Sequence, residues 1–150
     1  MGKTEKGAIG ALLDNYLQRL KHYHPISWEE LPEWKGASSV SVEEVKTREG
    51  KLILARITEK ETVFLLDEAG KEFSSRSFSE FLNKKMSSGS GTLTFVIGGP
   101  FGFSKELYDR AEAQLSLSKM TFSHQMIRVF FAEQLYRAFT ILRNEKYHHD

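Results

Sequence analysis

Three short segments carry residues whose types suit the binding of a small ligand. A glycine-rich loop at 98–102, Gly-Gly-Pro-Phe-Gly, follows the apolar run 93–97. Asp67 closes a second apolar run, and a Ser/Lys/Thr loop at 118–121 follows a third. Parallel sheets bind ligands at the carboxyl ends of their strands, where glycine lets a ligand lie against bare main chain. We therefore expect these segments to ring an uncharged or cationic cofactor.

Other kinds of site are poorly supported. No lysine of the phosphate-binding type follows the glycine loop, the glycine spacing differs from the dinucleotide fingerprint, and no serine elbow is present. No metal motif fits either, because His22 and His24 flank a tyrosine and His148 and His149 stand in the tail, where adjacent histidines are usually solvated. We predict no metal.

The composition is that of an ordinary globular protein. The 150 residues are 40% hydrophobic and 27% charged, which suits one domain over 1–150. The chain has no cysteine, which excludes disulfides and thiolate chemistry. Its net charge of +1 argues against binding nucleic acid by electrostatics alone. No signal peptide or membrane span is visible, so we expect a soluble, cytoplasmic protein with no membrane partner.

Helical and strand patterns alternate along the chain. We expect an α/β fold, with a mainly parallel sheet flanked by helices. The predicted helices cover 4–23, 41–55, 77–86, 104–111 and 123–142, and the predicted strands cover 26–31, 62–67, 93–97 and 115–117. A turn is expected at 68–70, and the short strand 26–31 alternates poorly.

The last predicted helix is apolar on nearly every side. Only a thin polar stripe interrupts it, which includes Arg128, Gln134 and Arg137. A helix of this kind is buried on more than one side. We therefore infer a homodimer through the last helix, with a single oversized core as the alternative.

Three sequence blocks carry a family resemblance. They are Phe-Val-Ile-Gly-Gly-Pro-Phe-Gly-Phe from 95, Leu-Ser-Leu-Ser-Lys-Met-Thr-Phe-Ser-His-Gln from 115, and Arg-Val-Phe-Phe-Ala-Glu-Gln-Leu-Tyr-Arg-Ala-Phe from 128. Together with the terminal Tyr-His-His they resemble the RlmH family of SPOUT methyltransferases. That family methylates N3 of a pseudouridine in 23S ribosomal RNA with S-adenosylmethionine.

The resemblance implies a SPOUT-type fold with a C-terminal trefoil knot, an exception to the rule that chains do not thread. It also implies a cofactor site made by three loops. The family's cofactor positions fall on Leu66, Gly99, Leu117, Ser118, Lys119, Met120, Thr121 and Phe122. Main-chain groups there would read the adenine edge without charged side chains.

The resemblance places the catalytic groups elsewhere, on the last helix and the tail, in a composite site across the dimer. Tyr147 and His148 are implied to position or deprotonate the target base, and Arg137 and Glu133 to support them. Glu133 and Arg137 are equally well explained as a helical i,i+4 ion pair.

The resemblance also implies an RNA partner, and it shows a difference from the family at the amino end of the chain. The large ribosomal subunit or the whole ribosome would be the partner, with phosphate contacts from Lys3, Lys6, Arg19, Lys21 and His22, unless these are merely solvated. The first strand of the family has no counterpart before Gly2. Two alternatives remain: a non-catalytic ribosome-associated relic of the fold and a nucleotide-binding module.

Overall fold

The computed structural model describes residues 1–34, 40–89 and 91–149. In chain order the elements are α1 (Ala8–Leu20), α2 (Val42–Leu54), β1 (Thr62–Glu72), α3 (Ser75–Ser87), β2 (Leu93–Ile97), α4 (Lys105–Arg110), β3 (Ala113–Ser116) and α5 (His124–Leu142). The three strands form one parallel sheet in the order β2-β1-β3. The α/β prediction with a parallel sheet flanked by helices is therefore confirmed.

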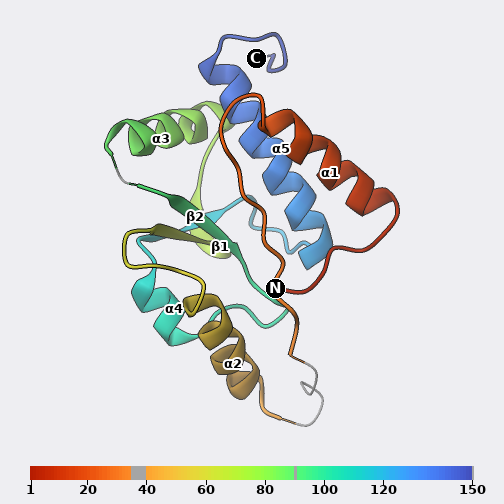
Figure 1. Ribbon diagram of the computed structural model, residues 1–150, viewed down its shortest axis with the longest axis vertical. Coiled ribbons are helices and arrows are strands. Elements are labelled where there is room, and N and C mark those ends of the chain that lie inside the picture. The colour runs from red at the N-terminus through yellow and green to blue at the C-terminus, as the bar shows by residue number, and fades with distance from the viewer. Residues whose placement is uncertain (35–39, 90, 150) are drawn as a thin grey trace.

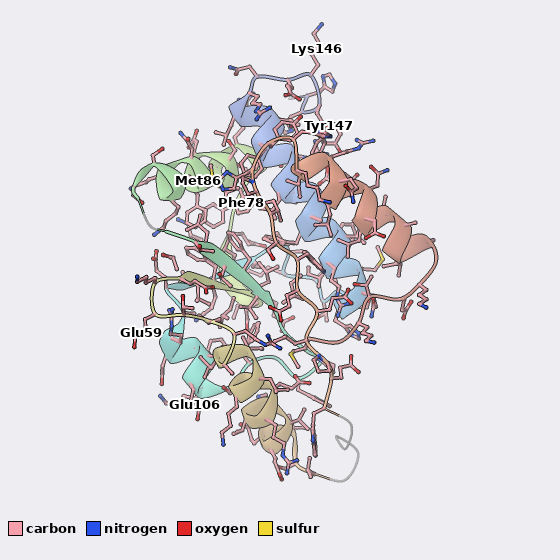
Figure 2. All side chains as sticks on the ribbon, viewed as in Figure 1. Glu59, Phe78, Met86, Glu106, Lys146 and Tyr147 are labelled. Carbon is pink, nitrogen blue, oxygen red and sulfur yellow. The ribbon has the colours of Figure 1, made fainter. Side chains whose placement is uncertain are left out.

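Helices cover both faces of the sheet, as Figure 1 shows: α1, α3 and α5 lie on one side and α2 and α4 on the other. The side chains of β1 alternate between these layers. Phe64 packs with Phe78 and Phe131 from α3 and α5, whereas Val63 and Leu65 pack with residues of α2 and α4. Figure 2 shows Phe78 between α3 and the sheet. A strand buried on both faces needs this continuous apolar run.

Several predicted boundaries are wrong for local reasons. The turn expected at 68–70 lies inside β1, which continues to Glu72 through an irregularity in its pairing with β3. The cap of α3 is Ser74 rather than Ser77, because the Ser74 hydroxyl accepts from the Ser77 amide. The strand expected at 26–31 does not form, although Leu31 accepts a hydrogen bond from the Gly2 amide. The predicted helix starts at 41, 104 and 123 are confirmed, and in the structure the serine at each of these positions is the N-cap.

The neighbours of α5 explain its apolar composition. It packs against α1, α3 and β2 within one chain. Arg128, expected on its polar stripe, is 2% exposed. Its guanidinium donates to the carbonyls of Met1 and Gly2 and, over 2.9 Å, to the Thr4 hydroxyl. Arg128 therefore fastens the first residues of the chain to α5, and most of the apolar surface of this helix is covered without a partner.

Candidate functional site

The parallel register brings the three predicted cofactor segments to one edge of the sheet. Leu66 of β1 pairs with Ile97 of β2 and with Leu115 of β3, so the residues that follow start side by side. Leu66 is half-buried, and the glycine loop and the 117–122 loop leave the sheet on either side of it. The structure thus assembles one site region from segments that lie far apart in the sequence.

The 117–122 loop is fastened to the irregular part of β1. The Lys119 ammonium donates to the Glu68 carbonyl over 3.1 Å, and the Thr121 hydroxyl donates to the Glu68 carboxylate over 3.1 Å. Glycine is required at position 70, because a Cβ there would stand 2.6 Å from the backbone of Gln114. These contacts fix the loop relative to Leu66, and they show Lys119 in a structural role.

Two serines shape the same loop from within. The Ser118 hydroxyl accepts from the Met120 amide over 2.9 Å, and the Ser116 hydroxyl donates to the Ser118 carbonyl over 2.9 Å. The Met120 side chain is 74% exposed, and that of Phe122 is 37% exposed and packs on Phe130 with ring centroids 5.0 Å apart. The loop therefore presents apolar side chains outward, available to a ligand or a second protein surface.

Asp67, next to Leu66, is held by two donors. Its carboxylate accepts from the Ala69 amide over 2.8 Å and from the Tyr108 hydroxyl over 2.6 Å. Burial, together with this hydrogen bond to Asp67, raises the pKa of Tyr108 to about 12. The phenol therefore stays protonated and keeps the carboxylate turned toward α4.

The glycine loop contains a close approach that the sequence reasoning missed. A Cβ at Gly99 would stand 2.6 Å from Glu49 Oε2, and one at Gly50 would stand 2.4 Å from Ser104 Oγ. The glycine loop and Ser104, the N-cap of α4 that follows it, therefore both pack against α2. Glu49 is 5% exposed, and burial raises the pKa of its carboxyl group. Gly50 was the signal in the sequence that could have indicated this contact, because a glycine inside a helical pattern often marks close packing.

The four predicted catalytic residues form a second group, made by the middle and C-terminal half of α5 and the tail that follows it. Tyr147 donates to Glu133 Oε1 over 3.1 Å, and Arg137 donates to the same carboxylate oxygen. The Arg137 guanidinium lies 4.7 Å from the centroid of the Tyr147 ring and 3.5 Å from His148 Nδ1. A guanidinium only donates, so Nδ1 is the acceptor in that contact. The i,i+4 ion pair of Glu133 and Arg137 therefore also holds the tail residues Tyr147 and His148. We call these four residues the tail cluster.

The tail cluster holds a phenol rather than a phenolate. Burial, the hydrogen bond with Tyr16 and the neighbouring Glu133 raise the pKa of Tyr147. Tyr16, whose hydroxyl lies 3.4 Å from that of Tyr147, was expected only as part of the apolar stripe of α1. Tyr147 is therefore suited to donate a hydrogen bond and to orient a substrate, and not to accept a proton.

Within one chain the two groups of site residues are separated along α5. Glu133 follows His124, the first residue of α5, by nine positions, which corresponds to about 14 Å of helix. In Figure 2 the Tyr147 label lies at the end of the molecule where α5 and the chain end. Glu133 and Arg137 therefore stand more than two helical turns beyond the beginning of α5, which the 117–122 loop precedes.

A cavity of 720 Å³ lies away from both groups, along the outer edge of β2. The whole of β2 lines it, together with apolar side chains from both layers, among them Ile53 and Ile57 on one side and Leu82, Phe131 and Leu135 on the other. None of the predicted cofactor residues borders it.

The described ranges contain neither a candidate metal site nor a candidate membrane-spanning helix. No group of three or more histidine, aspartate or glutamate residues there is arranged to hold a metal ion. No helix in the same ranges is long and apolar enough to cross a membrane.

Comparisons with known proteins assign the chain to a family. Residues 1–148 match the family model described as "Predicted SPOUT methyltransferase". The chain is 54% identical to the ribosomal RNA large subunit methyltransferase H of Christiangramia forsetii over 149 residues, which are 99% of this chain and 95% of that protein. It is 49% identical to the protein of the same name from Parabacteroides distasonis over 150 residues, which are 100% and 96% of the two chains.

Proposed function

The chain belongs to the SPOUT methyltransferase family, and from this membership we propose that it transfers a methyl group from S-adenosylmethionine to N3 of a pseudouridine in 23S ribosomal RNA. The observation that carries the proposal is the meeting of Leu66, the glycine loop and the 117–122 loop at one edge of the sheet. Relatives about half identical over nearly their whole length are named for methylation of large-subunit ribosomal RNA.

The cofactor segments fit S-adenosylmethionine in their chemistry. Leu66, Gly99 and Leu117 to Phe122 offer main-chain groups and apolar side chains, and the nearby charged groups of Lys119 and Asp67 are already engaged. Backbone donors and acceptors suit the edge of an adenine ring. When bound, the cofactor supplies an electrophilic methyl group on a sulfonium.

The chain itself contributes orientation. Tyr147 and Arg137 converge on Glu133, which leaves a fixed set of donors around a single carboxylate. A set of this kind can hold the base with N3 toward the methyl group, where alignment contributes more than a strong base. His148 lies beside this set, with Nδ1 3.5 Å from the Arg137 guanidinium.

We propose that the working site is shared by two copies of the chain. The separation of about 14 Å along α5 supports this arrangement, because a second protomer can bring its tail cluster to the cofactor segments of the first. The exposed side chains of Met120, Phe122 and Phe130 offer an apolar contact at the beginning of α5. The trefoil knot of the family and a cytoplasmic location stay predictions.

We also propose that the cavity beside β2 can accept a further apolar strand paired with the edge of β2. The amino group of Met1 already donates to the Ile97 carbonyl over 2.8 Å, the position of a ladder hydrogen bond at the end of β2. Apolar side chains line the cavity from both layers, as a strand buried on both faces requires.

Methyl transfer is tested directly with ribosomes that lack the modification. We expect radioactive methyl from labelled S-adenosylmethionine to appear on 23S RNA and at N3 of a pseudouridine after digestion. Calorimetry with S-adenosylhomocysteine reports cofactor binding separately. Cofactor binding without label on RNA would contradict the proposed activity, and the absence of both would contradict the cofactor site as well.

A further inference from the structure

Arginines and tyrosines interleave on one surface formed by α1, α5 and the C-terminal tail. We call it the arginine–tyrosine surface; its members are Tyr16, Arg19, Tyr23, Tyr136, Arg137, Arg143 and Tyr147. Each arginine lies over a ring. The guanidinium carbon of Arg19 is 5.5 Å from the Tyr136 centroid, that of Arg137 is 4.7 Å from Tyr147, and that of Arg143 is 4.4 Å from Tyr23.

The rings also contact one another around Tyr136. Its centroid is 4.8 Å from that of Tyr147, 5.6 Å from that of Tyr23 and 6.0 Å from that of Tyr16. All four rings are partly exposed. The planes therefore form a continuous, partly exposed cluster at the surface, and Tyr16, Tyr23 and Tyr136 also pack against the core.

Positive charge is in excess on this surface, although the whole chain carries only +1. Arg19, Lys21, Arg143 and Lys146 are exposed, and Figure 2 shows Lys146 projecting outward beyond the end of α5. The two nearby carboxylates are already engaged, Glu133 by Arg137 and Tyr147, and Glu145 by the Tyr23 hydroxyl over 2.5 Å. Within the described ranges, neither Arg19 nor Arg143 has a carboxylate at ion-pair distance.

We propose that the arginine–tyrosine surface is where RNA docks, with phosphates on Arg19 and Arg143 and unpaired bases stacked on the exposed planes. Aromatic rings and guanidinium planes are the groups that stack unpaired bases, and arginine pairs with phosphate in a fixed geometry. Stacking on tyrosine orders the guanidinium before the RNA arrives. This inference rests on the proposed action on ribosomal RNA.

The composition of the surface favours RNA over a protein partner. The large apolar side chains that are most exposed in the described chain lie outside it, namely Leu12, Val42, Leu52, Phe101, Met120, Phe122 and Phe130. The surface also includes Tyr147 and Arg137, which the proposed function places at the target base. RNA bound along it would therefore lead directly to the site of methyl transfer.

The test compares Arg19→Gln with a matched arginine at the other end of the molecule. Arg48 is exposed and lies 4.0 Å over the ring of Trp34, so Arg48→Gln removes the same kind of stack. Figure 1 places α2, which carries Arg48, at the opposite end from the tail. Affinity for ribosomes lacking the modification is measured as a function of salt concentration, and affinity for S-adenosylhomocysteine is measured by calorimetry.

We expect Arg19→Gln to weaken ribosome binding and to reduce the slope of log affinity against log salt by about 1. Arg48→Gln should match the wild type, and neither change should alter cofactor affinity. Arg19→Lys keeps the positive charge but has no planar guanidinium. It should therefore preserve the slope of log affinity against log salt while binding ribosomes more weakly than the wild type. Arg143→Gln should act like Arg19→Gln, although Arg143 also donates to the His22 carbonyl over 3.1 Å.

Three results would overturn the inference or its stacking component. If the wild type labels 23S RNA and Arg19→Gln binds ribosomes with wild-type affinity and slope, RNA docks elsewhere and the proposed function is unaffected. If the wild type neither binds ribosomes nor labels their RNA, the proposed function fails and the docking surface with it. An Arg19→Lys variant identical to the wild type would reject the stacking role.

Discussion

The Tyr147 hydroxyl donates to Glu133 Oε1 over 3.1 Å and thereby fastens the C-terminal tail to the middle of α5. The two residues are fourteen positions apart in the sequence, and Arg137 binds the same carboxylate oxygen. A short tail that would otherwise be mobile is thus given one position relative to the helix. If the tail orients the base, this hydrogen bond matters for transfer and not for cofactor binding.

Tyr147→Phe should lower kcat for methyl transfer by roughly tenfold or more, since a hydrogen bond to a charged group contributes about 1.5–3 kcal/mol. Cofactor affinity should not change. Tyr23→Phe is the matched control, because it removes the tyrosine–glutamate hydrogen bond to Glu145 but keeps the ring beneath Arg143 and leaves Glu133 untouched. Equal losses of activity in the two variants would argue that the tail only stabilises the fold.

Gly99→Ala should weaken cofactor binding, because the added Cβ would stand 2.6 Å from Glu49 Oε2 and displace the loop. Removing the obstructing carboxylate gives the reciprocal test. We expect Gly99→Ala combined with Glu49→Ala to recover part of the lost affinity, with a coupling of about 0.5–3 kcal/mol between the two sites. Strictly additive losses in calorimetry would show that the two residues do not constrain each other.

If the site is shared between two chains, two variants that are each impaired in a different part of it should complement each other. Tyr147→Phe removes the tail hydroxyl, and Gly99→Val blocks the cofactor loop. In a mixed dimer one site combines the intact cofactor loop of the first variant with the intact tail of the second. Mixing equal amounts after dissociation should restore roughly a quarter of the wild-type activity, because half of the random dimers are mixed and each has one working site. Activity no higher than that of the separate variants would place the whole site within one chain.

The pH dependence of stability should carry the signature of Glu49. Burial raises the pKa of its carboxyl group above the ordinary value of 4.5, an effect that the nearby amino group of Met1 opposes. A raised pKa favours the folded state below about pH 4.5, and this contribution is lost as the pH rises and the buried group ionises. Glu49→Gln should therefore unfold at a higher temperature than the wild type at pH 7.

The advantage of Glu49→Gln should shrink as the pH is lowered toward 4.5, measured by thermal unfolding across that range. Glu44→Gln, on the same helix but less buried, provides the comparison. A stabilisation that is independent of pH would point to a packing effect of the amide instead.

Periodicity and capping predicted the fold better than its long-range contacts. The apolar runs 93–97 and 62–67 predicted strands, Ser104 predicted a helix cap, and 123 was predicted as the start of the last helix, because these features depend on neighbouring residues. Burial of Arg128 was missed because its partners lie more than 120 positions away. The irregular pairing that extends β1 past Asp67 likewise depends on β3, which no local pattern reveals.

The same limit applies to the site. The glycine loop stands out by composition, whereas Glu49 is one acidic residue in a helix rich in charge, and its contact with Gly99 arises only when α2 packs on the loop. Tyr16 follows the apolar spacing of α1, so its hydroxyl gave no separate signal. The pairing of Glu133 with Arg137 could be predicted from their i,i+4 spacing, whereas a role for Tyr147 beside them was expected from family resemblance alone.

The free edge of β2 gives the most direct test of the proposed additional strand. Six residues of isoleucine and valine placed before Met1 should pair with β2, fill the cavity of 720 Å³ and convert the Met1 amino group into a backbone amide that still donates to Ile97. Burial of such a strand on both faces should raise the unfolding temperature by several degrees. The measurement is thermal unfolding of the extended and unextended chains.

A prefix of six glycine and serine residues is the matched control, because it can reach the same edge but offers no apolar side chains to the cavity. We expect it to leave the unfolding temperature unchanged. Hydrogen exchange should then distinguish pairing from non-specific burial. A paired strand protects the β2 amides that face the cavity, whereas an apolar prefix that stabilises the chain without protecting them occupies some other surface.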